Sequence, residues 1–363
     1  MPAHGGVATL ARQRPNLQGP LHKDRWQPMS DRISIRTGLG TLVAALLLLA
    51  ALSLTLSGTV RRLPVFGPDG DARLRQAMTR LTVDDTIALK ANHGRTAPRY
   101  DIGLFGNSRS VAVSHSDLGV APSRFFNFSV GGTVFEQSVT LAEHLARDGK
   151  LPGTVLISLD NVDIGFFGTI GWPSVFTSLP RIADDSVLIR RMGHASLPRI
   201  AAEPVRMALD QVKAFMNADR QLDYLRFLTG IGLEDGGRYR ADGSVPQGHL
   251  AAQPAADMIR FPAPNPYHLD HLALYVHRLA RLQAQGRRII VYESPLYPPL
   301  LREIEQGRKP ETAALRQRLF AACHAEGLTC LPAPVLQTAT PWPDCCHAPA
   351  AALGRFLHDL LPL

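Results

Sequence analysis

The chain contains 363 residues, of which 45% are hydrophobic and 19% are charged, a composition typical of a folded domain with a sizeable core. Its formal net charge of +8 comes from 39 basic and 31 acidic side chains that are scattered along the sequence. No basic run alternates with aromatic residues in the manner of a nucleic-acid groove. We therefore expect a folded chain that does not bind nucleic acid.

Two segments precede the expected folded domain. Residues 1–28 are rich in Pro, Gly, Gln and Arg, and we expect residues 1–36 to form a disordered tail on the cytoplasmic side of a membrane. Met29 begins a compact basic stretch, so we expect translation to start there. Residues 37–60 carry no charge and would form a helix about 36 Å long, which exceeds the roughly 30 Å hydrocarbon core of a bilayer.

We expect residues 37–60 to be an uncleaved transmembrane anchor. A buried core helix of this length without a polar face is uncommon in soluble domains. The apolar core of a cleavable signal peptide is usually shorter. Basic residues flank the segment on both sides in similar number, so charge alone does not fix which side the following domain faces.

Short apolar runs alternate with helical patterns in the rest of the chain. The apolar runs, each expected to form a buried strand, lie at 102–106, 124–130, 153–160, 287–293 and 328–332. The helical patterns lie at 108–119, 133–149, 266–286, 311–327 and 348–361. This alternation predicts that residues 99–363 form an α/β domain with a central parallel sheet covered by helices.

Two other segments are interpreted from their position. Residues 61–98 mix short helical patterns with charged turns, and we expect a stalk or a leading helical segment. Residues 162–266 form an insertion with helical patterns around 181–229 and a turn or hairpin signal at 236–246. Insertions in α/β sheets commonly lie over the carboxyl ends of the strands, where ligands bind, so we expect a cap or substrate-binding region.

Ser108, in "GNSRS", follows the first expected strand by two residues. A serine at this position suits a helix cap, and to act as a nucleophile it needs a base. The chain contains one Asp-x-x-His sequence, "DCCH", from Asp344 to His347, in a proline-rich loop before the last helix. Loops that follow parallel strands lie at one edge of the sheet, so His347 can reach Ser108, and Asp344 can fix the tautomer of the imidazole.

Donors for an oxyanion are predicted at two further strand ends. "FNFSVGG" ends in Gly131 and Gly132, whose backbone can approach an ester closely, and "ISLDN" ends in Asn161, whose amide can donate. The structural alternatives are a tight turn at the glycines and a turn cap at Asn161. Arg109, next to Ser108, is a candidate substrate contact.

Four cysteines lie near the C-terminus, at Cys323, Cys330, Cys345 and Cys346. Outside the cytoplasm Cys323 and Cys330 can form a disulfide, whereas the adjacent Cys345 and Cys346 would be strained by pairing. A zinc site would use the same cysteines with His324 and His347. The usual two-residue spacings of zinc ligands are absent, so we do not expect a metal.

The four blocks together resemble the SGNH or GDSL-like hydrolase superfamily, which is named for Ser, Gly, Asn and His. The blocks are "GNSRS" with Ser108, "NFSVGG" with Gly132, "LDN" with Asn161 and "DCCH" with Asp344 and His347. Gly131 is an alternative to Gly132. Two departures are that Asn107 stands where the family usually has Asp, and that "LD" stands where Gly often precedes the Asn.

The resemblance implies a three-layer α/β/α sandwich of flavodoxin-like type and a serine esterase or O-acyltransferase without metal or organic cofactor. Ser108, His347 and Asp344 would form the triad, and the N–H groups of Ser108 and Gly132 with Asn161 would form the oxyanion hole. The anchor makes the chain similar to periplasm-facing proteins that acetylate surface glycans. That similarity implies an inner-membrane protein with an acyl-ester donor, a glycan acceptor and envelope-assembly partners. The alternative is a catalytically silent scaffold that binds a glycan or an assembly partner.

Overall fold

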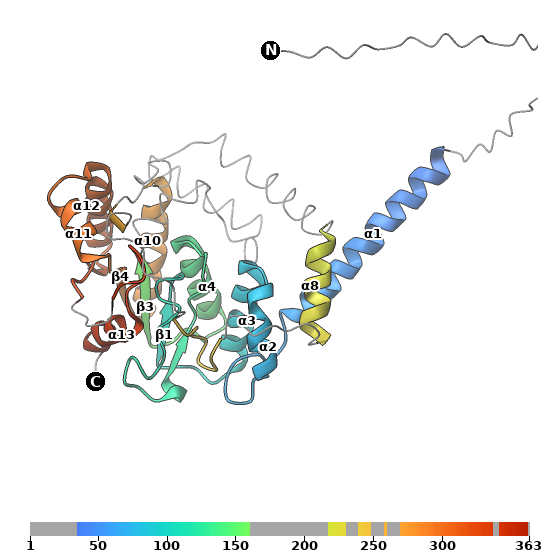
Figure 1. Ribbon diagram of the computed structural model, residues 1–363, viewed down its shortest axis with the longest axis horizontal. Helices are drawn as coiled ribbons and strands as arrows, with labels where there is room; N and C mark the ends of the chain where they lie inside the picture. Colours follow the sequence, from blue (N-terminus) through green and yellow to red (C-terminus); the bar gives the residue numbers. More distant parts are fainter. Residues whose placement is uncertain are drawn as a thin grey trace, which may run out of the picture. The chain divides into compact units, whose positions relative to one another are not determined.

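A computed structural model of the chain describes residues 35–159, 217–229, 239–247, 258–259, 269–336 and 341–361. The expected tail lies outside these residues except for its last two positions, and so does the expected start at Met29. The chain divides into two compact units, Met1–Leu47 and Leu48–Leu363. The second unit contains the sheet and the end of the first helix (Figure 1).

The apolar segment forms one helix, α1 (Ile35–Val60), of which Gly40–Val60 is long and apolar enough to cross a membrane. Leu47 and Leu48 are 66% and 72% exposed, which suits contact with lipid. Near the end of the helix, Ser53 is buried, and its hydroxyl accepts a hydrogen bond of 2.7 Å from the side chain of Gln221 on α8 (Ala218–Thr229). The last turns of α1 therefore pack against the folded unit.

Residues 61–98 belong to the folded unit and do not form a stalk. They contain α2 (Ala72–Ala77), the 3-10 turn η1 (Met78–Arg80) and α3 (Val83–Thr96), as a leading helical segment would. Apolar side chains of this segment enter the main core, because Val65, Phe66, Met78, Ile87 and Leu89 are all buried there. A stalk would leave such side chains in water, at a cost of about 1.5–3 kcal/mol for each large one.

The sheet has five parallel strands in the order β2-β1-β3-β4-β5. The strands are β1 (Ile102–Phe105), β2 (Phe125–Asn127), β3 (Thr154–Leu159), β4 (Arg288–Glu293) and β5 (Thr329–Leu331). A short 3-10 turn, η2 (Pro122–Arg124), leads into β2. All five strands fall within the predicted apolar runs, so the prediction of an α/β unit with a parallel sheet is confirmed.

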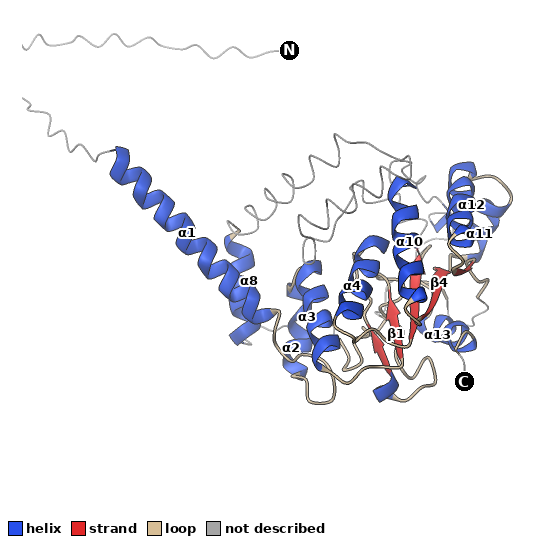
Figure 2. Ribbon diagram, turned by 180° about the vertical axis from the view of Figure 1, so that it is seen from behind, coloured by secondary structure: helices blue, strands red, loops and turns tan. Residues whose placement is uncertain are grey.

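Both faces of the sheet carry apolar side chains, as expected for strands buried on two sides. In β3, Val155, Ile157 and Leu159 enter one core and Leu156 enters the other. The first core contains residues of α4 (Phe135–Arg147), α10 (Leu269–Ala284) and α12 (Pro310–Ala325), and the second contains residues of α13 (Ala350–Asp359). Figure 2 shows α4 and α13 on opposite sides of the red strands.

Two helices differ from the sequence prediction. Residues 108–119 form successive turns and no helix, because side chains hold their backbone locally. The Asp117 carboxylate accepts from the backbone N–H of Ser114 at 2.8 Å and from its hydroxyl at 2.6 Å. Conversely, α11 (Pro298–Glu305) was not predicted. It is a short helix with proline at its start, and its apolar positions are Leu300, Leu301 and Ile304.

The predicted insertion is described only at α8, at residues 239–247 and at 258–259, and its other expected helices lie outside the described residues. The predicted turn is present, because the N–H of Gly243 donates to the carbonyl of Arg240 at 3.0 Å. This turn covers the free edge of β2, where the N–H of Asn127 donates to the carbonyl of Asp242 at 2.8 Å. These described parts pack at the β2 edge and against α1, and the rest of the predicted cap lies outside the described residues.

Candidate active site

Ser108 lies in a tight turn directly after β1. Gly106 suits this close approach, because a Cβ at this position would collide with the hydroxyls of Ser158 and Ser110 unless these side chains moved. The side chain of Asn107 accepts a hydrogen bond from the N–H of Arg109 at 3.0 Å, and its carbonyl accepts from Ser110 and Val111. Asn107 thus holds the turn by its own hydrogen bonds. No helix follows the turn, so Ser108 is not a helix cap.

A buried hydrogen bond supports the turn from the neighbouring part of the sheet. The Ser110 hydroxyl lies 2.7 Å from the Tyr292 hydroxyl of β4, and both residues are fully buried. Arg109 is also buried, at 6% exposure, where the sequence predicts a substrate contact.

Ser108, His347 and Asp344 form a continuous chain of hydrogen bonds. His347 Nε2 lies 2.9 Å from Ser108 Oγ, and His347 Nδ1 lies 2.7 Å from Asp344 Oδ2. Both distances are within the range expected between a nucleophile, its base and the group that orients the base. The His347 side chain is 33% exposed, so the chain of hydrogen bonds is open to a ligand.

The environment of Asp344 favours its ionised form. Burial opposes ionisation, but the hydrogen bond and charge of His347 and the backbone N–H groups of Cys346 and His347 together lower the pKa of Asp344 to about 2. These N–H groups donate to Asp344 Oδ1 at 2.7 Å and 2.8 Å. A carboxylate held in this way accepts from Nδ1–H and leaves Nε2 free to accept a proton.

Segments distant in sequence hold the loop that carries His347. The Cys345 carbonyl accepts from the N–H of Tyr297 at 2.9 Å, just before α11. The amide of Gln247 binds the other side of the loop, donating to the carbonyl of Ala348 at 3.1 Å and accepting from the N–H of Ala350 at 2.9 Å. The sequence contains no local pattern that identifies Gln247, which lies about 100 residues before the loop that it binds.

The glycine loop lies beside Ser108. A Cβ added to Gly131 would lie 3.9 Å from Ser108 Cβ, whereas a Cβ on Gly132 would face Val83 of α3. Gly132 has a φ of +79°, which favours glycine. Of the two glycines considered for the oxyanion hole, Gly131 is therefore the one placed next to Ser108. Asn161 lies outside the described residues.

Asn127 joins the serine turn to the glycine loop. Its fully buried amide donates to the carbonyls of Ser110 and Val113 at 2.9 Å and 2.8 Å. Its oxygen accepts from the N–H of Ser129 at 2.8 Å, two residues before Gly131. The sequence places Asn127 at the start of "NFSVGG", but this role in positioning the two loops was not predicted.

A buried lysine supports the same region from α3. Lys90 Nζ donates to the carbonyls of Asn127, Ser129 and Gly243. Burial lowers the pKa of Lys90 well below its usual value, although the nearby Asp242 opposes this effect. Three carbonyl acceptors match the three donors of an ammonium group, so Lys90 can bind the glycine loop to the turn at Arg240–Gly243.

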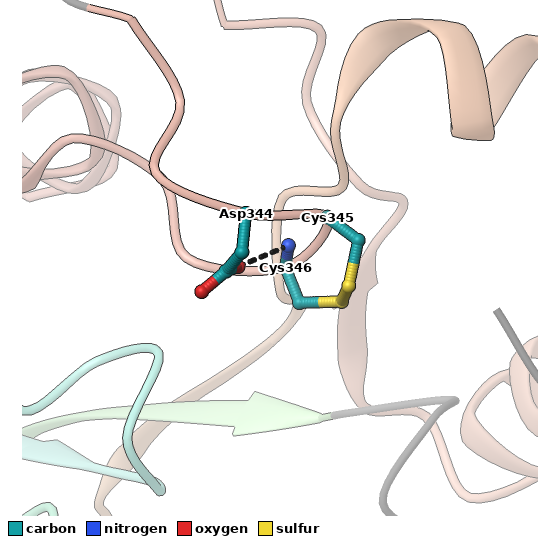
Figure 3. Close-up of side chains that lie close together, drawn as sticks. All are labelled: Asp344, Cys345 and Cys346. Atoms are coloured by element: carbon teal, nitrogen blue, oxygen red, sulfur yellow. Dashed lines mark hydrogen bonds between the residues drawn. A yellow bond between two sulfur atoms is a disulfide. The ribbon is translucent and has the colours of Figure 1, made fainter. Parts of the chain in front are cut away.

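All four cysteines of the chain are in disulfides. Cys323 on α12 pairs with Cys330 on β5, and Cys345 pairs with the adjacent Cys346, as Figure 3 shows. Pairing of the adjacent cysteines differs from the sequence expectation. Asp344, Cys345 and Cys346 offer a close group of oxygen and sulfur atoms, but paired sulfurs are not the thiolates that zinc binds.

Comparison with known proteins does not place the chain in a family. No family model matches it, and neither a curated protein nor a solved structure is significantly similar to it.

Proposed function

We propose that the chain is a membrane-anchored serine esterase or O-acyltransferase. The observation that supports this most strongly is the continuous set of hydrogen bonds from Asp344 through His347 to Ser108, at 2.7 Å and 2.9 Å. It is supported further by the place of Ser108, directly beyond the carboxyl end of β1, where parallel α/β sheets commonly bind ligands.

In the proposed reaction His347 Nε2 takes the proton of Ser108 as the serine oxygen attacks an ester carbonyl. The carbonyl oxygen becomes an oxyanion, which the N–H groups of Ser108 and a loop glycine, Gly131 or Gly132, would stabilise together with Asn161. The alcohol leaves with the proton from His347, and the acyl group stays on Ser108. Water or a sugar hydroxyl then gives its proton to His347 and accepts the acyl group, and His347 returns the proton to the Ser108 oxygen as the acyl–serine bond breaks.

The proposal extends to fold type and location. We propose a three-layer α/β/α sandwich related to SGNH hydrolases, which would have α4, α10 and α12 on one face of the sheet and α13 on the other. We also propose that α1 anchors the protein in the cytoplasmic membrane with the sheet-containing unit outside, where a cell-envelope glycan would be the acceptor. The exposed leucines of α1 support the membrane contact.

The test is hydrolysis of 4-nitrophenyl acetate by the full-length protein in detergent. We expect Ser108→Ala to reduce the rate to the uncatalysed background, a loss of roughly a thousandfold or more, because the nucleophile is removed. Ser123→Ala, at an exposed serine before β2, is the matched control and should retain the wild-type rate. Equal rates for the wild type and Ser108→Ala would favour the catalytically silent scaffold.

A further inference from the structure

We propose that the Cys345–Cys346 disulfide is a thiol–disulfide exchange site that controls the position of His347. Its reactant would be a dithiol, either a small molecule or the dithiol of a partner protein. Its effect on catalysis rests on the proposed function, whereas the exchange reaction and its effect on the loop do not.

The position of this disulfide in the sequence is the first observation. Cys345 and Cys346 are the two residues between Asp344 and His347. Their disulfide, which Figure 3 shows, closes a small ring that also contains the peptide bond joining them. The ring therefore restricts rotation of the backbone that joins Asp344 to His347.

The hydrogen bonds of the same residues are the second observation. The N–H of Cys346, a member of the ring, donates to Asp344 Oδ1 at 2.7 Å, and the N–H of His347 donates to the same oxygen at 2.8 Å. The other oxygen of Asp344 accepts from His347 Nδ1. Both oxygens of the carboxylate thus depend on the backbone conformation that the ring restricts.

The two sulfurs differ in their surroundings. Cys346 is buried at 4% exposure, whereas Cys345 is half-buried at the side of a small apolar cluster formed by α11 residues and Ala333. An incoming thiolate would therefore attack Cys345 Sγ. Tyr297 binds the carbonyl of Cys345 and Gln247 binds Ala348 and Ala350. These hydrogen bonds do not depend on the disulfide, so opening the ring can loosen the loop locally while the rest of the fold stays intact.

The exchange reaction consumes one dithiol and transfers two electrons. A thiolate of the dithiol bonds to Cys345 Sγ, and the Cys345–Cys346 bond breaks with Cys346 leaving as a thiolate that takes a proton. The second thiol of the dithiol then attacks the mixed disulfide and releases Cys345, which also takes a proton. The products are two protein thiols and the oxidised dithiol.

Reduction should decrease the rate of acylation at Ser108. With the ring open, the peptide group between Cys345 and Cys346 is held only by its hydrogen bonds to Tyr297 and Asp344, and His347 loses part of its fixed orientation. A misplacement of about 1 Å in a catalytic group can cost roughly a hundredfold in rate. We expect a decrease of about tenfold or more for the reduced protein.

The first experiment asks whether the disulfide exists. The full-length protein is purified in detergent without reductant, alkylated with iodoacetamide and digested with trypsin and Asp-N protease, which should release the peptide from Asp344 to Arg355. We expect this peptide to be unalkylated and lighter by two hydrogens than the same peptide after reduction. Alkylation of both cysteines without prior reduction would overturn the proposal.

The second experiment measures the loop without relying on catalysis. Hydrogen exchange of the peptide from Asp344 to Arg355 is followed before and after treatment with dithiothreitol. We expect faster exchange after reduction in the wild type and in the Cys323→Ser/Cys330→Ser variant, which keeps only the adjacent pair. Exchange in Cys345→Ser/Cys346→Ser should not respond to dithiothreitol. An unchanged exchange rate in the reduced wild type would contradict control of the loop.

The third experiment measures the rate at which a fluorophosphonate labels Ser108 in the same proteins. Dithiothreitol should slow the labelling of Ser108 by about tenfold or more in the wild type and in Cys323→Ser/Cys330→Ser. In Cys345→Ser/Cys346→Ser the labelling should be slow both with and without dithiothreitol. A reduced wild type that labels at the oxidised rate would refute control of catalysis. Absence of labelling in every sample would refute the proposed function instead, and the first two experiments would still decide the exchange site.

Discussion

The ionisation of Asp344, in the candidate site, contributes to the free energy of unfolding of the protein. Its pKa in the folded chain is about 2, below the ordinary value of 3.8. An acid whose pKa is lowered by folding stabilises the folded state when ionised, and this contribution is present above the ordinary pKa and is lost as the pH falls through the folded pKa. The relevant window therefore runs from about pH 4 down to about pH 2.

We predict that the stability difference between the wild type and Asp344→Asn depends on pH in this window. The wild type should lose about 2 kcal/mol of unfolding free energy relative to Asp344→Asn between pH 5 and pH 2, because Asn has no charge to lose. Urea denaturation of both proteins in detergent measures this. Asp69→Asn, at an exposed position, controls for the loss of one carboxylate. A difference that stays constant with pH would contradict the account of Asp344.

Single residues of the site could be predicted from the sequence only where the chemistry of the side chain indicated a catalytic role. Ser108 and the Asp344–His347 spacing stood out because a nucleophile, a base and an acid are chemically distinct. Asn127 and Lys90 did not stand out, because their partners are backbone carbonyls. Any residue supplies a backbone carbonyl, so no sequence pattern records such contacts. Which of Gly131 and Gly132 lies next to Ser108 likewise depended on the course of the backbone.

Among the elements, the segment at residues 239–247 connects three parts of the candidate site. Its Asp242 carbonyl pairs with β2, its Val245 N–H donates to the Val111 carbonyl beyond the serine turn at 2.8 Å, and its Gln247 amide binds the loop after His347. A segment from the predicted insertion thus holds both the serine turn and the histidine loop.

We predict that Gln247→Ala lowers kcat for ester hydrolysis by about tenfold and changes KM less. The reason is that the substitution frees the backbone beside His347. Loss of its two hydrogen bonds should also cost about 1–2 kcal/mol of stability. Steady-state kinetics and urea denaturation measure the two effects. Gln76→Ala, on the exposed surface of α2, is the matched control. A normal rate in Gln247→Ala would show that the segment does not position His347.

The strands were predictable because each is a short apolar run closed by glycine or polar residues. Helices were predictable where an amphipathic pattern ran for several turns, as in α4 and α10. The prediction of a helix at residues 108–119 was wrong. Their apolar spacing suits a helix, but hydrogen bonds between Ser114 and Asp117 hold the backbone in turns. The helix α11 has only eight residues, so its apolar pattern repeats too few times to be recognised in the sequence.

At the scale of the whole molecule, α1 is joined to the folded unit by polar contacts as well as apolar ones. Asp85 of α3 is fully buried and accepts from Arg61 Nε and from the Tyr224 hydroxyl of α8, both at 2.8 Å. Ser53 and Gln221 form a second link. These contacts lie within the unit Leu48–Leu363, so the last turns of α1 belong to the unit that contains the candidate site.

We predict that the folded unit faces the outside of the cell. All native cysteines are in disulfides, so an introduced cysteine provides a single reactive thiol. An impermeant maleimide should label Ser123→Cys in intact spheroplasts and should label Ser30→Cys, before α1, only after lysis. The wild type, which should not be labelled, is the control. The reverse pattern would place the site in the cytoplasm and exclude an external glycan acceptor.

The central claim is that Ser108 is a nucleophile activated by His347. The most direct measurement is the mass of the full-length protein after incubation with a fluorophosphonate, followed by mapping of the modified residue, for the wild type, His347→Ala and Ser108→Ala. We expect one adduct on Ser108 of the wild type, labelling slowed by roughly a thousandfold or more in His347→Ala, and no adduct in Ser108→Ala. A folded wild-type protein that remains unmodified, or that is modified at another serine, would contradict this claim.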